Sequence, residues 1–328
     1  MEEFLFLEPP GKALEKFLSH LNIRPSEERI PSWDSLGRVV FGPVAAPFSL
    51  PAFRRSTVDG YAVLASDTHG ASQSLPAYLR IQGEVRMGED SELSLESQAC
   101  AAIHTGGMLP GGADAVVMIE NTELLDGSQV EIMRPAAPGE NVIQVGEDVL
   151  EGESILRAGV RIGPAEIGGL MALGLDEINV SKQPRIGIIS AGDEVVPPGA
   201  PLLPGQVYDI NTYSLAALIE QNGGLPSAYG IAEDTFAALR EIAARALYEC
   251  DMVVLTAGSS LGMRDLTAQV INSLGEPGVI IHGVNVRPGK PTILGVCGQK
   301  PVIGLPGNPA SALVIARIFI LPLIKAYL

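Results

Sequence analysis

The sequence predicts a multidomain chain of α/β and β class: a C-terminal α/β domain with a mostly parallel sheet, preceded by irregular β-rich domains. From about residue 183, short apolar runs alternate with helical patterns, as in βαβ units. Before that point, short alternating runs are separated by turn residues, and the whole chain contains 37 glycines and 25 prolines. Its 328 residues correspond to about two or three domains.

The N-terminal half is predicted to begin with a helix and to continue with short strands. Leu14, Phe17 and Leu21 recur at helical spacing within residues 11–22, so we expect an amphipathic helix there. Alternating patterns predict strands over 60–65, 78–81, 113–119 and 129–133. The region from about 40 to 180 is therefore expected to be irregular and rich in β structure.

In the C-terminal half, predicted strands and helices alternate. The predicted strands cover 185–190, 251–256 and 301–305, and the predicted helices cover 213–221, 235–248, 265–274 and 309–327. Arg317 and Lys325 interrupt the last, apolar segment, so we interpret it as a buried terminal helix and not as a membrane span. Sheets of this kind bind ligands at the carboxyl ends of their strands.

The charge balance is acidic. Asp plus Glu number 38 and Lys plus Arg number 22, which gives a net charge of −16. A field of this sign argues against binding to nucleic acid or to an anionic membrane. Cys100, Cys250 and Cys297 form no close pair, which excludes a C-x-x-C site and predicts a reducing, cytoplasmic compartment.

Three predicted strand ends in the C-terminal half carry small or polar residues. They are 190–194 (Ser-Ala-Gly-Asp-Glu), 256–265 (Thr-Ala-Gly-Ser-Ser-Leu-Gly-Met-Arg-Asp) and 304–309 (Gly-Leu-Pro-Gly-Asn-Pro). Asn308 suits a helix N-cap, and Pro309 suits the first helical position. A turn shaped for packing explains any one of them equally well, but three at consecutive strand ends predict a shared site for an anionic, polar ligand.

Charged residues at the same edge extend this prediction. Its carboxylates are Asp193, Glu194, Asp234 and Asp265. They would repel phosphate unless a cation intervened, so the combination favours Mg²⁺, with solvated loop acids as the alternative. Arg287 and Lys290 flank a Pro-Gly turn, which predicts a clamp for an oxyanion, with a solvated turn as the alternative.

Two loops of the N-terminal half are also candidates. Residues 56–63 place Asp59 before a glycine and a strand, although a plain β-turn has the same pattern. Residues 104–114 are dense in glycine, which indicates a flexible or ligand-contacting loop. The four histidines are scattered and indicate no zinc cluster, and we interpret His104 and His282 as polar turn residues.

Taken together, these motifs resemble those of the molybdopterin molybdenumtransferases, the molybdenum insertases, over the whole chain. The matching segments are 56–62, 105–106, 111–117, 146–148, 192–194, 258–262, 264–265, 287–291 and 304–309. Each segment alone is weak, but their order and spacing together are specific to this family.

The resemblance implies that molybdate is inserted into adenylylated molybdopterin with release of AMP, in the presence of Mg²⁺. It implies an elongated homodimer, with the adenylating enzyme as a further partner. The implied domains are a linker or dimerisation region with the N-terminal helix at 1–45 and 142–182, a small β-rich domain at 46–141, and a three-layer, molybdopterin-binding-like α/β domain at 183–328. The cleft would lie between that last domain and the small β domain of the other subunit.

The resemblance also implies residue roles. The expected catalytic residues are Asp59, Thr105, Asp265 and Lys290. The expected ligands of Mg²⁺ are Glu194, Asp234 and Asp265. The residues expected to contact the pterin, its phosphate or molybdate are Gly258, Ser260, Arg287, Pro306, Asn308, Pro309 and Ser311. No covalent nucleophile is required, because such a cleft acts by positioning and neutralising its ligands.

Three departures from the family pattern accompany this prediction. Members carry a further C-terminal β-barrel, which we expect to be missing after Leu328. Gly283 stands where some members have Lys, and Arg287 replaces the more usual Lys.

Two other functions stay open: a non-catalytic molybdopterin-binding or scaffold module, and a nucleotide oxidoreductase. The latter is disfavoured because no G-x-G-x-x-G follows a predicted strand.

Overall fold

The computed structural model describes residues 7–89, 92–257 and 261–328. The chain divides into two compact units. The first, which we call the α/β unit, comprises Met1–Gly42, Ala158–Gly168 and Asp176–Leu328, and the second, the β unit, comprises Pro43–Arg157 and Gly169–Leu175. The finer division expected from the sequence, into 1–45 with 142–182, 46–141 and 183–328, stays a prediction.

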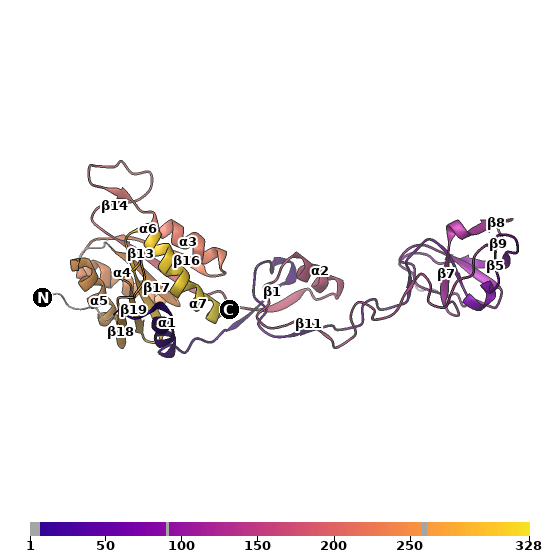
Figure 1. The fold of residues 1–328 in the computed structure, drawn as a ribbon, viewed down its shortest axis with the longest axis horizontal. Helices are drawn as coiled ribbons and strands as arrows, with labels where there is room; N and C mark the ends of the chain where they lie inside the picture. Colours follow the sequence, from indigo (N-terminus) through magenta and orange to yellow (C-terminus); the bar gives the residue numbers. More distant parts are fainter. Residues whose placement is uncertain (1–6, 90–91, 258–260) are drawn as a thin grey trace. The chain divides into compact units, whose positions relative to one another are not determined.

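The core of the α/β unit is a six-stranded sheet in the order β16-β13-β17-β20-β19-β18 (Figure 1). The strands are β13 (Arg185–Ala191), β16 (Leu225–Ala232), β17 (Met252–Ala257), β18 (Pro277–His282), β19 (Ile293–Cys297) and β20 (Lys300–Pro306). The first four in sheet order are parallel, and β19 and β18 add an antiparallel edge. The predicted, mostly parallel sheet is confirmed, although the sequence predicted only β13, β17 and β20.

Helices cover both faces of this sheet, because alternate residues along each strand face opposite sides. The helices are α1 (Pro10–Ser19), α3 (Asn211–Gln221), α4 (Phe236–Glu249), α5 (Leu261–Leu274), α6 (Pro309–Ile315) and α7 (Leu321–Tyr327). Ile186 and Ile188 of β13 pack in one core with α1, α3, α6 and α7. Ile189 packs in the other core with α4 and α5. The three-layer architecture is therefore confirmed.

The apolar C-terminal segment is helical throughout, with a π-helical turn, η4 (Ala316–Ile320), between α6 and α7. Pro322, just after this turn, has no backbone N–H to donate, which favours a local change of helix type. By length and composition alone Pro309–Tyr327 could cross a membrane, but 44% of its apolar window is buried inside the protein. Phe319 and Leu323 are fully buried in the core, so the segment is the buried terminal helix that the sequence predicts.

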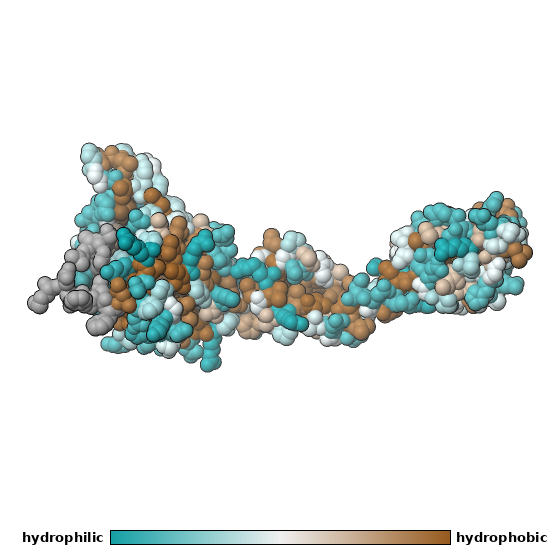
Figure 2. All heavy atoms as spheres, viewed as in Figure 1, coloured by the Kyte–Doolittle hydropathy of each residue, from teal (hydrophilic) through white to brown (hydrophobic). Residues whose placement is uncertain are grey.

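Two peripheral features complete the α/β unit. One is an antiparallel pair, β1 (Glu27–Pro31) with β12 (Glu177–Ser181), followed along the chain from β1 by a short 3₁₀ turn η1 (Ser32–Asp34). Helix α2 (Pro164–Ala172) is divided between the two units at Gly168. The other is an excursion between β13 and α3 that carries two short parallel strands, β14 (Val195–Val196) and β15 (Val207–Tyr208). Figure 2 shows apolar atoms on this excursion, where Leu202 and Leu203 are exposed.

The β unit contains a six-stranded sheet in the order β7-β4-β6-β5-β9-β8. Its strands are β4 (Gly60–Val63), β5 (Ala77–Glu84), β6 (Ala99–Ile103), β7 (Ala115–Met118), β8 (Thr122–Leu124) and β9 (Gln129–Ile132). Its 3₁₀ turns are η2 (Ala65–Thr68) and η3 (Ile119–Asn121). Short ladders join β3 (Arg55–Ser56) to β10 (Val142–Ile143) and β2 (Val44–Ala45) to β11 (Ser154–Leu156). The predicted irregular, β-rich character is confirmed.

Gly60 is required by close packing at the start of β4. A Cβ atom at this position would lie 1.9 Å from the carbonyl oxygen of Val117 in β7, far inside van der Waals contact. The two strands are hydrogen-bonded neighbours in register, so the clash would be with rigid backbone. Asp59 is thereby placed one residue before a fixed point of the sheet.

Candidate functional site

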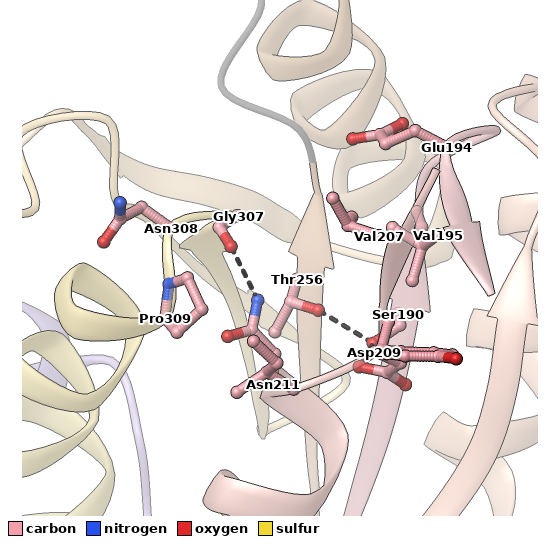
Figure 3. Close-up of a pocket in the computed structure, with 13 residues that line it drawn as sticks. Ser190, Glu194, Val195, Val207, Asp209, Asn211, Thr256, Gly307, Asn308 and Pro309 are labelled. Atoms are coloured by element: carbon pink, nitrogen blue, oxygen red, sulfur yellow. Dashed lines mark hydrogen bonds between the residues drawn. The ribbon is translucent and has the colours of Figure 1, made fainter. Parts of the chain in front are cut away.

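A cavity of about 340 Å³ lies at the carboxyl ends of the parallel strands in the α/β unit (Figure 3). Its walls come from the ends of β13 and β17, the β14–β15 excursion, the start of α3 and the turn between β20 and α6. The lining residues are Ser190, Ala191, Glu194, Val195, Val207, Tyr208, Asp209, Ile210, Asn211, Thr256, Gly307, Asn308 and Pro309. This is the edge at which the sequence predicts a ligand.

The floor of this pocket is a buried group of polar side chains, which we call the hydroxyl cluster: Ser190, Asp209, Thr212 and Thr256. The Ser190 Oγ donates to Asp209 Oδ1 at 2.9 Å and lies 2.9 Å from Thr212 Oγ1 and 3.1 Å from Thr256 Oγ1. Each residue of the cluster is at most 6% exposed. The register that pairs Ser190 with Thr256 on neighbouring strands places these two hydroxyls side by side.

Two hydrogen bonds fix the start of α3 beneath the pocket. Asp209 Oδ1 also accepts from the backbone N–H of Thr212 at 3.1 Å, which satisfies a free donor of the helix. Asn211 Nδ2 donates to the carbonyl oxygen of Gly307 at 2.8 Å. Because a carbonyl can only accept, this contact assigns the amide nitrogen of Asn211 and leaves Oδ1 on the other side.

The rim on the α6 side contains the predicted N-cap. Asn308 Oδ1 accepts from the backbone N–H of Ser311 at 3.2 Å and lies 3.4 Å from its hydroxyl, and Pro309 is the first residue of α6. Pro306 ends β20. The structure thus brings Asn308 and Pro309 to the pocket and places Ser311 against them, with its side chain buried.

Three carboxylates, Asp193, Glu194 and Asp234, gather on the opposite side of the pocket, and we call them the acidic rim; of the three, only Glu194 lines the cavity. The backbone N–H of Asp234 donates to Asp193 Oδ1 at 3.3 Å. Partial burial, followed by the negative charges of Asp193 and Glu194, raises the pKa of Asp234. The Oδ1 atom of Asp234 is buried and has no hydrogen-bond partner. Repulsion and an unsatisfied oxygen make this a place where a cation would be stabilising.

The remaining predicted metal ligand, Asp265, is exposed on α5 and makes no contact with this group among the described residues. Within 7–89, 92–257 and 261–328, three or more acidic, histidine or cysteine side chains are nowhere positioned to hold a metal ion. Gly258 and Ser260 lie outside the described residues.

The two predicted cations lie on the turn between β18 and β19. Arg287 and Lys290 are exposed, while Gly289 between them is buried against α6, where a Cβ atom would lie 2.4 Å from Ile315 Cδ1. The Thr292 hydroxyl donates to the Gly289 carbonyl at 2.6 Å, which holds the turn in place. The cations are therefore on a fixed turn that packs on α6, but they do not line the cavity.

A second cavity of the α/β unit is larger, about 690 Å³. It is lined by residues of η4 and α7 and by Val39, Gly159, Arg161, Asn222 and Leu328. Arg161 in its wall is already bonded to two backbone carbonyls, those of Gly37 and Asn222. None of the residues singled out by the sequence motifs lines it. We therefore place the candidate site in the smaller cavity, where the motifs converge.

In the β unit, the structure brings together two residues that the sequence singled out separately. Asp59 Oδ1 accepts from the backbone N–H of Thr105 at 2.8 Å and from its hydroxyl at 3.2 Å. These bonds, with a smaller contribution from His104, lower the pKa of Asp59. The Nδ1 atom of His104 lies 3.6 Å from Asp59, and its Nε2 atom lies 3.4 Å from Glu84 Oε1. We call these four residues the loop cluster.

Sequence reasoning missed several of these residues. The sequence indicates only a turn residue at His104 and gives no signal for Glu84, because the contacts of His104 with Asp59 and with Glu84 join distant parts of the chain. Asp209 and Asn211 were also missed. A signal for them exists: the polar run 208–212 (Tyr-Asp-Ile-Asn-Thr) directly precedes the predicted helix at 213, where capping residues are expected.

Comparison with known proteins matches both halves of the chain to family models. Residues 9–174 match a family model described as the MoeA N-terminal region, domains I and II, and residues 187–326 match a probable molybdopterin binding domain. The pocket lies within the second match.

Two curated relatives are similar over most of the chain. A molybdopterin molybdenumtransferase of Nostoc is 35% identical over 308 residues, which are 93% of this chain and 70% of the relative. Molybdopterin molybdenumtransferase 2 of Mycobacterium tuberculosis is 37% identical over 299 residues, covering 89% and 73%. The crystal structure of a molybdopterin biosynthesis MoeA protein from Pyrococcus horikosii is 40% identical, with a TM-score of 0.88 over 98% of this chain and 80% of that one.

Proposed function

Because the chain belongs to the molybdopterin molybdenumtransferase family, enzymes of molybdenum cofactor biosynthesis, we propose that it inserts molybdate into adenylylated molybdopterin and releases AMP. The observation that carries this proposal is the pocket at the ends of β13, β17 and β20, which has a buried polar floor and, at Glu194, adjoins the acidic rim. The alternative of a non-catalytic molybdopterin-binding or scaffold module is not favoured, because the relatives are named as enzymes.

In this proposal the chain binds, orients and neutralises its ligands. Arg287 and Lys290 hold the molybdate dianion by charge-assisted hydrogen bonds, for which their fixed turn is suited. Pro306, Asn308, Pro309 and Ser311 form the wall against the pterin or its phosphate. Gly258 and Ser260 are assigned to the same ligand by the family resemblance.

The acidic rim fits Mg²⁺ by its own chemistry. A bound divalent cation would give the unpartnered Asp234 Oδ1 a partner and offset the repulsion that raises the pKa of this residue. Mg²⁺ usually keeps several waters and takes one or two carboxylates together with substrate phosphates, so a complete protein cage is not needed. We propose Glu194 and Asp234 as its direct ligands; Asp265, the third ligand that the family resemblance implies, is not positioned with them in the described part of the chain. When bound, Mg²⁺ supplies charge neutralisation at the phosphate groups.

We also propose a homodimer in which Asp59 and Thr105 of one subunit serve the pocket of the other, as the family resemblance implies. The state of Asp59 supports a role outside its own unit: it is exposed, and its hydrogen bonds favour the ionised form. Light scattering at low micromolar concentration tests this, and a monomer would contradict it. A cytoplasmic location and an adenylating partner enzyme belong to the same proposal, and the free, buried cysteines agree with a reducing compartment.

The decisive experiment measures AMP release from adenylylated molybdopterin in Mg²⁺, with molybdate, with tungstate and with neither. We expect release that depends on the oxyanion, and we expect Asp265→Asn to keep its fold and lose about 100-fold or more in rate. Asp126→Asn, which alters an exposed turn of the β unit, is the matched control and should leave the rate unchanged. A wild-type protein that binds the pterin but releases no AMP would instead be a binding module.

A further inference from the structure

We propose that the floor of the pocket is a surface of hydrogen-bond acceptors that binds the donor-rich edge of a pterin ring, and that Thr256 is a specificity-determining residue. The inference rests on the proposed function, because it states which part of that substrate the floor contacts. It is drawn from the hydrogen bonds of the hydroxyl cluster, of which Figure 3 marks the one between Thr256 and Ser190.

The directions follow from counting hydrogens. A serine hydroxyl has a single hydrogen and two lone pairs. Ser190 donates its hydrogen to Asp209 Oδ1, so its contacts with Thr212 and Thr256 require both threonine hydroxyls to donate to Ser190. The hydroxyl hydrogen of Thr256 is thereby committed inside the protein. Towards a ligand, Thr256 Oγ1 can offer only lone pairs.

The neighbouring side chains also offer hydrogen-bond acceptors. Asp209 Oδ1 accepts the bonds from Ser190 and Thr212, while Oδ2 accepts none within the described part of the chain. Asn211 donates one of its two amide hydrogens to the Gly307 carbonyl, and its Oδ1 is buried with no partner. Asp209, Asn211 and Thr256 all line the pocket and are 2–8% exposed. The floor therefore presents acceptor atoms on all three residues, and the second amide hydrogen of Asn211 is the one spare donor among these side chains.

A floor of acceptors distinguishes the parts of an adenylylated pterin, because they differ in the hydrogen-bond donors they present. Phosphate and molybdate oxygens carry negative charge and only accept hydrogen bonds, so the floor disfavours them. The ring edge of adenine consists mostly of acceptors. The aminopyrimidinone part of a pterin presents an amino group next to a ring N–H, which is a row of donors. A buried acceptor that stays unpaired in the complex weakens binding, so the floor selects this edge.

The test compares pterin with lumazine, in which a carbonyl oxygen replaces the 2-amino group. Fluorescence titration of the wild-type protein should give an affinity for pterin at least about 10-fold higher than for lumazine. Thr256→Val, which has nearly the same shape, should lose about 10-fold in pterin affinity and most of the preference. Thr256→Ser should restore pterin affinity to within about 3-fold of wild type, because it keeps the hydroxyl. AMP affinity should be the same in all of these proteins.

Thr68→Val is the matched control. Thr68 is a fully buried threonine of the β unit whose hydroxyl is also hydrogen-bonded, so this variant reports the general effect of removing such a group. It should leave the preference for pterin intact. Thermal unfolding by circular dichroism identifies any variant that has lost its fold.

The inference is overturned if the wild-type protein binds lumazine as well as pterin, if it binds no pterin at millimolar concentration, or if Thr256→Val weakens AMP more than pterin. These results are distinct from failure of the proposed function. A protein that prefers pterin but shows no molybdate-dependent AMP release retains this inference and loses the proposal of metal insertion.

Discussion

The hydroxyl cluster of the α/β unit and the loop cluster of the β unit use the same local arrangement in opposite surroundings. In each, one carboxylate oxygen accepts from a hydroxyl and from a backbone N–H: Asp209 from Ser190 and Thr212, and Asp59 from Thr105 twice. Asp209 is 6% exposed, whereas the side chain of Asp59 is 59% exposed. Because an unmade hydrogen bond is costly only when water cannot replace it, the first arrangement supports the fold and the second leaves a charge available.

The strongest test of this difference is to remove the buried carboxylate. Asp209→Ala leaves the Ser190 hydroxyl and the Thr212 N–H without their acceptor, so we expect a loss of about 2–3 kcal/mol in the free energy of unfolding. Asp209→Asn, which keeps an acceptor oxygen, should lose less. Urea denaturation measures both, and an Asp209→Ala protein within about 0.5 kcal/mol of wild type would show that the cluster is not structural.

A smaller effect is expected at the pocket rim. Asn308→Ala removes the N-cap of α6 and should cost about 1 kcal/mol of stability. Thr235→Ala removes the equivalent cap of α4, away from the pocket lining, and should cost a similar amount. Only Asn308→Ala should also weaken binding of the adenylylated pterin, as measured by equilibrium titration. Equal effects of the two variants on binding would remove Asn308 from the ligand site.

The acidic rim gives a pH-dependent prediction. Burial and the neighbouring charges raise the pKa of Asp234 above its ordinary value of 3.8. A carboxyl whose pKa is raised on folding favours the folded state while it is protonated, so this contribution is lost as the pH rises through the raised pKa. Millimolar Mg²⁺ should therefore raise the melting temperature above that pH, by about 2 °C, and have no such effect below it. Asp234→Asn should abolish the gain, and a gain that persists in Asp234→Asn would place the ion elsewhere.

The smallest effect on stability is expected at the loop cluster. Asp59→Ala should melt within about 1 °C of wild type, because water replaces the hydrogen bonds of an exposed carboxylate. The same variant should lose at least about 10-fold in AMP release if Asp59 serves the partner's pocket. Thr105→Val is the companion variant and should behave alike. A melting temperature that falls as far as in Asp209→Ala would erase the difference between the two regions.

Much of the fold could be predicted from the sequence because its patterns are local. The apolar runs that form β13, β17 and β20 and the helical spacing of α3 and α4 are visible in short windows. The antiparallel strands β18 and β19 were missed because short runs among glycines and prolines resemble loops. The π-helical turn η4 was missed because its residues continue the same apolar helical pattern.

The site could be predicted in part for the same reason. Asn308 and Pro309 form a local capping signal, and the structure confirms the cap. The bond between Ser190 and Asp209 depends on how the chain returns after an excursion of 19 residues, and the contact of His104 with Asp59 depends on strand pairing in the β sheet. Such contacts are set by register and topology, which no short window of sequence contains.

The tight fit of Gly60 against β7 implies that adjacent positions evolve under unrelated constraints. A Cβ atom at position 60 would collide with the main chain whatever the protein does, so folding alone requires glycine there. Asp59, the solvated residue before it, contributes little to the packing, so only a function of its charge would require an aspartate there. In relatives that have lost the activity, we expect Asp59 to be replaced by other residues while Gly60 is kept. The residue at position 59 therefore indicates whether such a relative is still an enzyme.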